Sequence, residues 1–395
     1  MSAARDALFT WILRHAAGIG DDCALVAALA ERLRAAGVGC ERLWIGYTRP
    51  HPLLAGVGAS WEEGRGVKQT TLSLASRRFA QPQAGPILDA LTRDAPVRQR
   101  IADLPRGSHG ISTLFWDDGY SEVVFLGFPW EGGGGLLTMA TRRPGGFEAG
   151  EVELLGSLRD ALGVVMHLRD RMAFLDILAS TYLGRDTGAR VLAGAIHRGD
   201  GETIRAAIWF SDLRGFTSLS ERLPLPSLLG VLDDAFEAQV AAIEAEGGEV
   251  LKFIGDGMLA IFRPGEGSEA AACRRALAAA RSLAGRIGEI NGGREERGEA
   301  AIRYGVALHF GDVLYGNIGA PSRLDFTVIG PAVNLAARLE GVCGQLGVPV
   351  VASPAFAVRC PGAVAPAGEF ALKGLAEPVA AFLPVEGGGE VEAAG

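Results

Sequence analysis

The sequence predicts an α+β protein whose two folded parts are joined by a long helix. A helical pattern over residues 1–36 gives way to short β-rich runs that continue to about residue 143. A single helical pattern then covers residues 151–183, and strands and helices alternate from residue 202 onward. With 395 residues, the chain is long enough for two or three domains, each with its own hydrophobic core.

Composition is typical of a folded protein and disfavours two classes of partner. The hydrophobic share is 48% and the charged share is 21%. A net charge of −8 disfavours nonspecific binding to nucleic acids or anionic membranes. No apolar run reaches the roughly 18–20 residues of a membrane-spanning helix, and the first residues lack the apolar core of a signal peptide. We therefore expect no nucleic-acid partner, no membrane span and a cytoplasmic location.

Cysteine and histidine usage argues against disulfides and zinc. The five cysteines are scattered and never form a CxxC pair, which is typical of thiols in a reducing compartment. The six histidines show no HxxxH spacing, so the sequence gives no support for a zinc site.

Residues 1–150 are expected to form the first domain. Apolar side chains recur at helical spacing up to Leu33, and Gly37 and Gly39 end that pattern. The β-rich runs are separated by Asp117-Asp118-Gly119 and by the glycines at 132–135. These runs are Leu43–Tyr47, Ile111–Trp116, Glu122–Leu126 and Leu136–Ala140.

This order of a helix, several strands and a closing helix after Glu148 resembles a GAF-type sensor domain. The resemblance implies a regulatory domain that responds to an unidentified small molecule or physical signal. A plain dimerisation domain is the alternative. Aromatic side chains could line a ligand pocket, although such residues more often belong to a core: Trp44, Trp61, Phe115, Trp116 and Trp130.

Residues 151–200 are expected to form a signalling helix and linker. An apolar stripe runs along the helix with one skipped step after Val165, as in a coiled coil with a stammer. The stripe either packs on its own domain or forms a parallel dimer helix that carries a signal. Its members are Leu155, Leu158, Leu162, Val165, Leu168, Met172, Leu175, Ala179 and Tyr182. The segment 184–188 then breaks the helix.

Residues 201–385 are expected to form the second domain, and residues 386–395 a disordered tail. The strands and helices alternate in a regular order. The strands are expected at 203–210, 249–253, 258–262, 302–310, 348–352 and 369–372, and the helices at 223–245, 270–290 and 331–342.

Three short segments of this second domain carry residues suited to phosphate chemistry. Asp212 follows a buried strand, beside backbone amides at Phe216 and Thr217 that could hold phosphate oxygens, although an aspartate there could also cap a helix. Asp256 lies at a hairpin tip, where Gly-Asp-Gly also suits a tight turn. Lys252, four residues earlier, interrupts an apolar strand and needs a partner, and strand alternation puts it on the side of Asp256 if the turn keeps the pleat.

The third segment begins a helix. Asn334 and Arg338 are four residues apart and share one face of that helix, where they could also interact only with each other. Thr327 precedes the turn that starts the helix, in a position where threonine is also an ordinary strand residue.

Taken together, these three segments resemble the catalytic domain of the class III nucleotidyl cyclases, which implies a ferredoxin-like βαββαβ fold. Motifs at His309–Gly319 and Phe370–Gly374 extend the resemblance over residues 203–385. It implies that Asp212, Leu213 and Asp256 hold two Mg²⁺ or Mn²⁺ ions. It also implies that Asn334 orients the ribose and that Arg338 stabilises charge in the transition state.

The resemblance also implies the substrate. Lys252 and Thr327 would recognise the base, and an ammonium suits the N1 acceptor of adenine rather than the N1 donor of guanine. ATP is therefore expected. A threonine at 327 is similar to the soluble-adenylyl-cyclase-like branch of the family. Lys373 would contact the triphosphate, with Arg303 a weaker candidate, and one complete residue set per chain implies a homodimer with two composite sites.

Two other interpretations stay open at this stage. One is a guanylate cyclase, which Lys252 disfavours. The other is a noncatalytic dimer that binds a nucleotide as an effector, which the presence of both aspartates, Asn334 and Arg338 disfavours.

Overall fold

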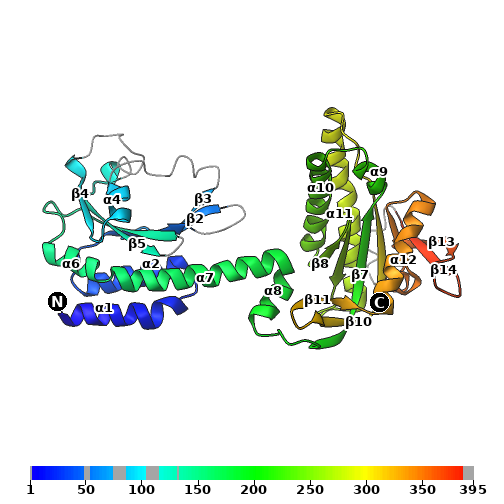
Figure 1. Cartoon of the computed structure of the whole chain (residues 1–395), viewed down its shortest axis with the longest axis horizontal. Helices are drawn as coiled ribbons and strands as arrows, with labels where there is room; N and C mark the ends of the chain where they lie inside the picture. The colour runs from blue at the N-terminus through cyan, green and yellow to red at the C-terminus, as the bar shows by residue number, and fades with distance from the viewer. Residues whose placement is uncertain (1, 49–53, 74–85, 104–114, 131–132, 386–395) are drawn as a thin grey trace, which may run out of the picture. The chain divides into compact units, whose positions relative to one another are not determined.

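The computed structural model describes residues 2–48, 54–73, 86–103, 115–130 and 133–385. The chain splits into two units, Met1–Ile177 and Leu178–Gly395, each with its own sheet (Figure 1). Both units mix helices and strands, which confirms the α+β prediction. Within the described ranges, no helix is both long and apolar enough to cross a membrane.

The first unit is built on an antiparallel six-stranded sheet with the order β3-β2-β1-β6-β5-β4. The strands are β1 (Arg42–Thr48), β2 (Leu54–Glu62), β3 (Gly66–Ser73), β4 (Val97–Arg100), β5 (Glu122–Trp130) and β6 (Gly133–Thr141). The helices are α1 (Ser2–His15), α2 (Asp22–Ala35), α4 (Pro86–Thr92), α6 (Ala149–Ser157) and α7 (Arg159–Leu183), with 3-10 turns at Ala16–Gly18 and Ile101–Asp103.

Alternation along β5 divides this unit into two cores. Val124 and Leu126 face a core shared with α1, α2, α6 and the start of α7, whereas Val123 and Phe125 face a smaller core with α4. The helical pattern predicted over 1–36 is present but interrupted, because Asp21 caps a new helix by accepting a hydrogen bond from the Ala24 amide at 2.7 Å.

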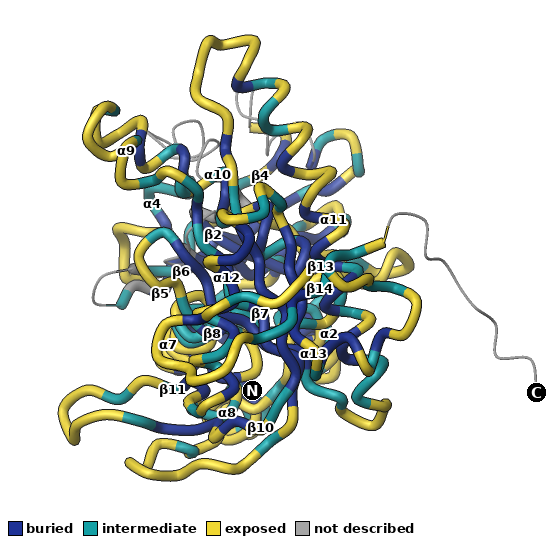
Figure 2. Tube along the Cα trace, turned by 90° about the vertical axis from the view of Figure 1, so that its right-hand side faces the viewer, coloured by how far each residue is buried: buried dark blue, intermediate teal, exposed yellow. Residues whose placement is uncertain are grey.

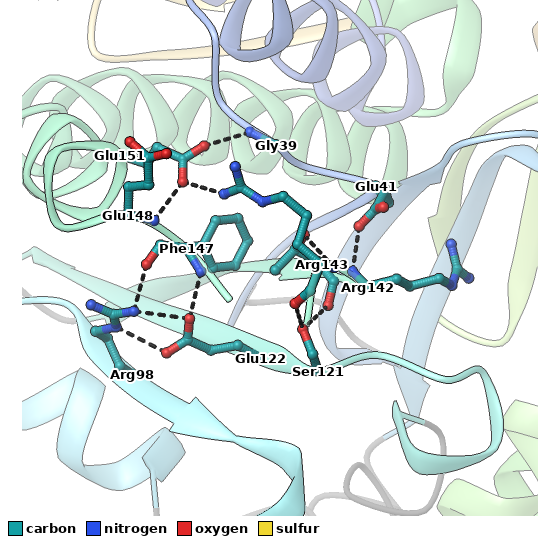
Figure 3. Close-up of polar contacts among 11 residues, drawn as sticks. Gly39, Glu41, Arg98, Ser121, Glu122, Arg142, Arg143, Phe147, Glu148 and Glu151 are labelled. Atoms are coloured by element: carbon teal, nitrogen blue, oxygen red, sulfur yellow. Dashed lines mark hydrogen bonds and ion pairs between the residues drawn. The ribbon is translucent and has the colours of Figure 1, made fainter. Parts of the chain in front are cut away.

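Two buried glutamates anchor the chain where it leaves the sheet of the first unit (Figure 3). Glu122 on β5 accepts from Arg98 at 2.9 and 3.0 Å and from the Phe147 amide at 2.7 Å. Glu151 in α6 accepts from the Gly39 amide at 2.7 Å and from the Arg143 guanidinium. Burial alone would raise the pKa of both carboxyls, but these donors lower it. The start of α6 is therefore tied to β4, to β5 and to the segment that precedes β1.

The apolar stripe of the linker helix divides at the skipped step. Its first four members, up to Val165, are buried in the core of the first unit. Four members after the skip are exposed: Leu168 at 49%, Met172 at 56%, Leu175 at 54% and Tyr182 at 80%. The first half thus packs on its own domain, and the coiled coil expected for the second half stays a prediction.

Two local predictions in this unit were wrong. Phe115 and Trp116 lie in a helical turn rather than a strand, while the rest of that segment, 111–114, lies outside the described residues. Gly133 to Gly135 belong to β6 instead of a turn. A Cβ on Gly135 would collide with the Phe128 ring on the paired strand, so the glycine makes room for an aromatic side chain.

The second unit contains a sheet with the order β13-β14-β12-β10-β7-β9-β8, with β11 paired to β10. The strands are β7 (Gly201–Leu213), β8 (Glu249–Ile254), β9 (Gly257–Phe262), β10 (Tyr304–Ala320), β11 (Arg323–Ile329), β12 (Val350–Ala352), β13 (Val364–Phe370) and β14 (Val379–Pro384). The helices are α8 (Arg185–Leu192), α9 (Phe216–Ser220), α10 (Leu225–Ala245), α11 (Glu269–Glu296), α12 (Pro331–Leu346) and α13 (Pro354–Ala357). The path β7-α10-β8-β9-α11-β10 gives the strand order β10-β7-β9-β8, which is the predicted βαββαβ fold.

Helices cover both faces of this sheet, and β7 is buried through its middle (Figure 2). Ala207 and Trp209 face the core formed with α10 and α11, while Ala206 and Ile208 face a core that includes α12 residues. The strand expected at 369–372 instead ends at Phe370, and the tail predicted at 386–395 lies outside the described residues.

Candidate active site

The two aspartates meet where β7 ends beside the β8–β9 turn. The turn is the pair Gly255-Asp256, with Gly255 at φ 63°, between Ile254 and its ladder partner Gly257. A Cβ on Gly257 would lie 2.5 Å from the Ser211 carbonyl oxygen and 3.3 Å from Asp212 Oδ1. Glycine at 257 therefore lets the turn come close enough to bring Asp256 to Asp212.

The proximity of two carboxylates is energetically costly without a cation. Burial, followed by the charge of Asp256, raises the pKa of Asp212 to about 6. Arg214 and the Leu213 amide lower this pKa, but they offset the rise only in part. A divalent cation would remove that repulsion, and carboxylate oxygens are ligands that Mg²⁺ and Mn²⁺ prefer. The pair therefore fits a metal site, although among the described residues it is not joined by a third His, Cys, Asp or Glu ligand.

An ion pair that the sequence analysis missed lies next to these aspartates. Arg214 Nη2 lies 2.5 Å from Glu340 Oε1 and donates to the Glu340 carbonyl oxygen at 2.7 Å. Burial raises the pKa of Glu340 to about 7; Arg214 opposes this rise, and the charges of Asp212 and Asp256 add to it. Glu340 is only 6% exposed. The region therefore contains three acidic groups, Asp212, Asp256 and Glu340, and one arginine close to them.

Strand alternation predicted that Lys252 and Asp256 lie on the same side of the hairpin. In the structure, however, Lys252 pairs with a different aspartate. A register shift between Val250 and Lys252 interrupts the regular ladder, and Lys252 Nζ lies 3.2 Å from Asp325 Oδ2 on β11. Nothing in the sequence near Lys252 pointed to Asp325, because β8 and β11 are distant in the chain and come together only in the fold.

Thr327 lies two residues beyond Asp325 on β11 and hence on the same face of that strand. Its side chain is 3% exposed, and its Oγ1 has no hydrogen-bond partner among the described residues. A buried hydroxyl without a partner is costly, which makes this position suited to a ligand that supplies one.

Asn334 and Arg338 lie on the exposed side of α12, as the i, i+4 spacing predicts. The position that a Cβ would take on Gly374 is 3.5 Å from Arg338 Nη2, so the loop that carries the exposed Lys373 runs beside Arg338. In the part of the chain that is described, Arg338 forms no ion pair with a carboxylate. These side chains form a polar, cationic surface of the kind that attracts phosphate.

The remaining predicted residues lie at the start of α9. Leu213 is buried at 5%, and Gly215, with φ 74°, turns the chain into Phe216 and Thr217. A Cβ on Gly215 would lie 3.5 Å from Arg303 Nη2, which puts a further cation near this turn.

Contacts and positions on shared elements thus divide the predicted residues into three groups. The first contains the aspartates and the α9 turn, the second contains Lys252 and the β11 residues, and the third contains Asn334, Arg338 and Lys373. Residues 180–186, β8 and Asp325 also line a cavity of about 1020 Å³ that reaches Lys252 but not the aspartates. Within the described residues, no hydrogen bond or ion pair links Arg338 to the aspartates.

The second unit is similar to a family of known proteins. Residues 201–383 match the family described as "Adenylate and Guanylate cyclase catalytic domain". The match covers less than half of the chain, and the βαββαβ core with the residue groups described above lies within the matched residues.

Two curated relatives are similar over this domain. An adenylate cyclase of Anabaena cylindrica is 36% identical over 156 residues, which cover 38% of this chain and 30% of the relative. Adenylate cyclase 1 of Rhizobium meliloti (strain 1021) is 31% identical over 154 residues, covering 38% of this chain and 23% of the relative. The matches thus span less than a third of either relative.

Among solved structures, the adenylyl cyclase CyaB of P. aeruginosa aligns with a TM-score of 0.44 at 24% identity. The alignment covers 47% of this chain and 96% of that one.

Proposed function

We propose that the protein is a cytoplasmic adenylate cyclase that converts ATP to 3′,5′-cyclic AMP and pyrophosphate in a homodimer controlled by its N-terminal unit. The observation that carries the choice of ATP is the position of Lys252, whose ammonium pairs with Asp325 on β11, the strand on which the buried Thr327 hydroxyl has no partner among the described residues. The five free cysteines suit the reducing cytoplasm.

In this proposal, Lys252 donates to N1 of adenine and the Thr327 hydroxyl accepts from the N6 amine. Guanine would present its N1–H donor to the ammonium, whereas the threonine hydroxyl could still donate to O6, so the mismatch with GTP falls on Lys252. A site that hydrogen-bonds one base rejects the other because the mismatch leaves polar groups unsatisfied. This pairing is similar to that of the soluble-adenylyl-cyclase-like branch.

The reaction joins the ribose 3′-oxygen to the α-phosphorus and breaks the bond to the β-phosphate, so that pyrophosphate leaves. When bound, two Mg²⁺ or Mn²⁺ ions would supply the positive charge that favours an ionised 3′-hydroxyl and a neutralised triphosphate. Asp212 and Asp256, with Leu213 beside them, would hold this charge in place.

Other side chains position the substrate and stabilise its charge. Asn334 orients the ribose, and Arg338 stabilises the charge that develops around the α-phosphate. Lys373, next to Arg338, and the amides of Phe216 and Thr217 bind the triphosphate oxygens.

A homodimer explains why the aspartates and Arg338 form separate groups within one chain. In the proposed dimer, the aspartates of one subunit act with Asn334 and Arg338 of the other, giving two equivalent composite sites. The exposed stripe from Leu168 to Tyr182 supports this arrangement, because an unpaired apolar stripe on a helix suits a parallel partner helix.

The N-terminal unit would act as a GAF-like sensor whose signal travels along α6 and α7. The contacts of Glu122 and Glu151 support this part of the proposal, because they fix the start of α6 to the sheet. A change in that sheet would therefore move the helix rather than be absorbed by a loose connection.

The proposal is tested by product analysis with purified full-length protein, Mn²⁺ and either ATP or GTP. Lys252→Glu should abolish cyclic AMP formation while the protein stays folded. Arg5→Glu, which reverses the charge of an exposed arginine in the other unit, serves as the matched control and should leave the activity unchanged. Cyclic GMP as the main wild-type product would contradict the choice of ATP.

A further inference from the structure

The guanidinium of Arg214 occupies a narrow space beside the segment 212–215, which the proposed function makes a metal-binding loop. Gly305 on β10 is the direct ladder partner of Asp212, and a Cβ at Gly305 would collide with both Arg214 Nη2 and Glu340 Oε1. On the other side, a Cβ on Gly344 would lie 3.1 Å from Arg214 Nη1. Two glycines thus make the space in which Arg214 reaches α12.

Arg214 belongs to the same extended run as Asp212. The Arg214 amide donates to the Arg303 carbonyl oxygen at 2.8 Å, which continues the β7–β10 ladder one residue past the end of β7. Because the residues are two apart in extended chain, a displacement of Arg214 shifts the backbone that holds Asp212.

Glu340 belongs equally to the helix that carries Arg338. The two residues are two apart in α12, so Glu340 points into the core at 6% exposure while Arg338 faces outward. Any rotation of α12 that displaces the Glu340 carboxylate therefore displaces the Arg338 guanidinium as well.

The pair is more than generic packing. Arg214 forms an ion pair with the carboxylate of Glu340 and donates a hydrogen bond to its carbonyl oxygen, so it makes two contacts with one residue. Glu340 also lies close enough to Asp212 and Asp256 to be influenced by their charge. Apolar residues in place of a buried ion pair often give an equally stable protein, so stability alone does not explain why this pair is present.

We propose that Arg214 and Glu340 are positioning residues. Within each chain, they hold the metal-binding loop and the helix that carries Asn334 and Arg338 in a fixed position relative to each other. This inference rests on the proposed homodimer. Since the two half-sites of one chain serve different composite sites, the Arg214–Glu340 pair links the two active sites of the dimer.

Mixed dimers test the link directly. One chain carries Asp212→Ala and the other Arg338→Ala, with different affinity tags, so the purified mixed dimer has one intact site and one doubly damaged site. Glu340→Gln is then placed in either chain. In the Arg338→Ala chain it acts on the aspartates of the intact site, and in the Asp212→Ala chain it acts on Asn334 and Arg338 of that site.

The two placements should have different effects. On the aspartate side, the Mn²⁺ concentration for half-maximal activity should rise about tenfold, as expected for ligands displaced by a fraction of an ångström. On the Arg338 side, kcat should fall about tenfold with an unchanged Mn²⁺ requirement. An effect from only one placement would overturn the link while leaving the cyclase intact. If the mixed dimer without Glu340→Gln has no activity, both the composite site and the link are wrong.

A second readout does not depend on turnover. Binding of Mn²⁺ to full-length protein, followed by electron paramagnetic resonance of the free ion, should weaken about tenfold in Glu340→Gln. Asp234→Asn is the matched control, since it breaks a partly buried pair to Arg294 in α11, 2.7 Å long, and neither residue is among the charges that shift the pKa of Asp212 or Glu340. Equal Mn²⁺ binding by the wild type and both variants would overturn the positioning role.

Gly305→Ala provides a variant that keeps every charge. Its methyl group would force the pair apart, so it should reproduce the Glu340→Gln effects, and it serves if Glu340→Gln does not fold. A folded Gly305→Ala enzyme with wild-type Mn²⁺ binding and kcat would contradict the proposal.

Discussion

Replacing Asp212 by asparagine should stabilise the metal-free protein while abolishing its activity. Burial and the neighbouring Asp256 raise the pKa of Asp212 from its ordinary value of 3.8 to about 6. A carboxyl whose pKa is higher in the folded protein disfavours folding when it is ionised. Asparagine has a similar shape and no charge, so it removes this repulsion.

The size of the effect follows from that pKa. A rise from 3.8 to about 6 corresponds to roughly 3 kcal/mol at pH 7.5. Because asparagine still buries a polar group, we expect a gain of about 2 kcal/mol, or roughly 4–8 °C in Tm for a domain of this size. At pH 5 the gain should be about half as large, because Asp212 is then largely protonated in the folded protein.

Differential scanning calorimetry in EDTA measures this gain. The transition of the second unit is identified by the upward shift that the proposed function predicts when Mn²⁺ and ATP are added to the wild type. Asp233→Asn, at an exposed aspartate of α10, is the control and should leave Tm unchanged. An Asp212→Asn protein that is no more stable than wild type at pH 7.5 would refute the crowded-carboxylate account.

Three further predictions test other parts of the structure. Thr327→Val should raise KM for ATP about tenfold without lowering Tm, because it removes a buried hydroxyl that has no partner among the described residues; a large loss of Tm would instead indicate a structural role. Glu122→Gln should destabilise the first unit by about 3 kcal/mol at pH 7, whereas Asp6→Asn, from an exposed pair, should not. Because the donors lower the pKa of Glu122, this difference should shrink as the pH falls below about 4.5, which calorimetry across pH would show. Leu175→Glu should weaken dimerisation at least tenfold in analytical ultracentrifugation, because it puts a charge in the exposed apolar stripe proposed to contact the partner helix. An unchanged dimer dissociation constant would show that the stripe is not part of the dimer interface.

Local patterns carried most of the fold prediction. The period of apolar residues located α10, α11 and α12, and the Gly-Asp-Gly turn located the β8–β9 hairpin. Glycines limited the prediction in the first unit. Gly133 to Gly135 suggested a turn, but they continue a strand where a neighbouring aromatic ring needs space.

The sequence could suggest candidate site residues only where their chemistry is local in the chain. Asp212, Asp256, Asn334 and Arg338 each stand in a recognisable short segment. Glu340 was missed because, two residues after Arg338, it reads as an ordinary charged helix residue, and its burial against Arg214 depends on the packing of α12 on β7.

Asp325 was missed for a related reason. The partner of Lys252 comes from β11, 73 residues further along the chain, and the β8 ladder is shifted just before the lysine. Sequence alternation assumes a regular pleat and cannot anticipate such a shift.

The central claim is that the C-terminal unit cyclises ATP by means of four side chains, those of Asp212, Asp256, Lys252 and Arg338. The most direct measurement is the cyclic nucleotide formed by purified full-length protein with Mn²⁺ and equal concentrations of ATP and GTP. The account predicts cyclic AMP as the main product, and none in Asp256→Ala. Two results would contradict it. One is the absence of any cyclic nucleotide, both from the full chain and from a mixture of Asp212→Ala and Arg338→Ala chains. The other is a product that persists in Asp256→Ala.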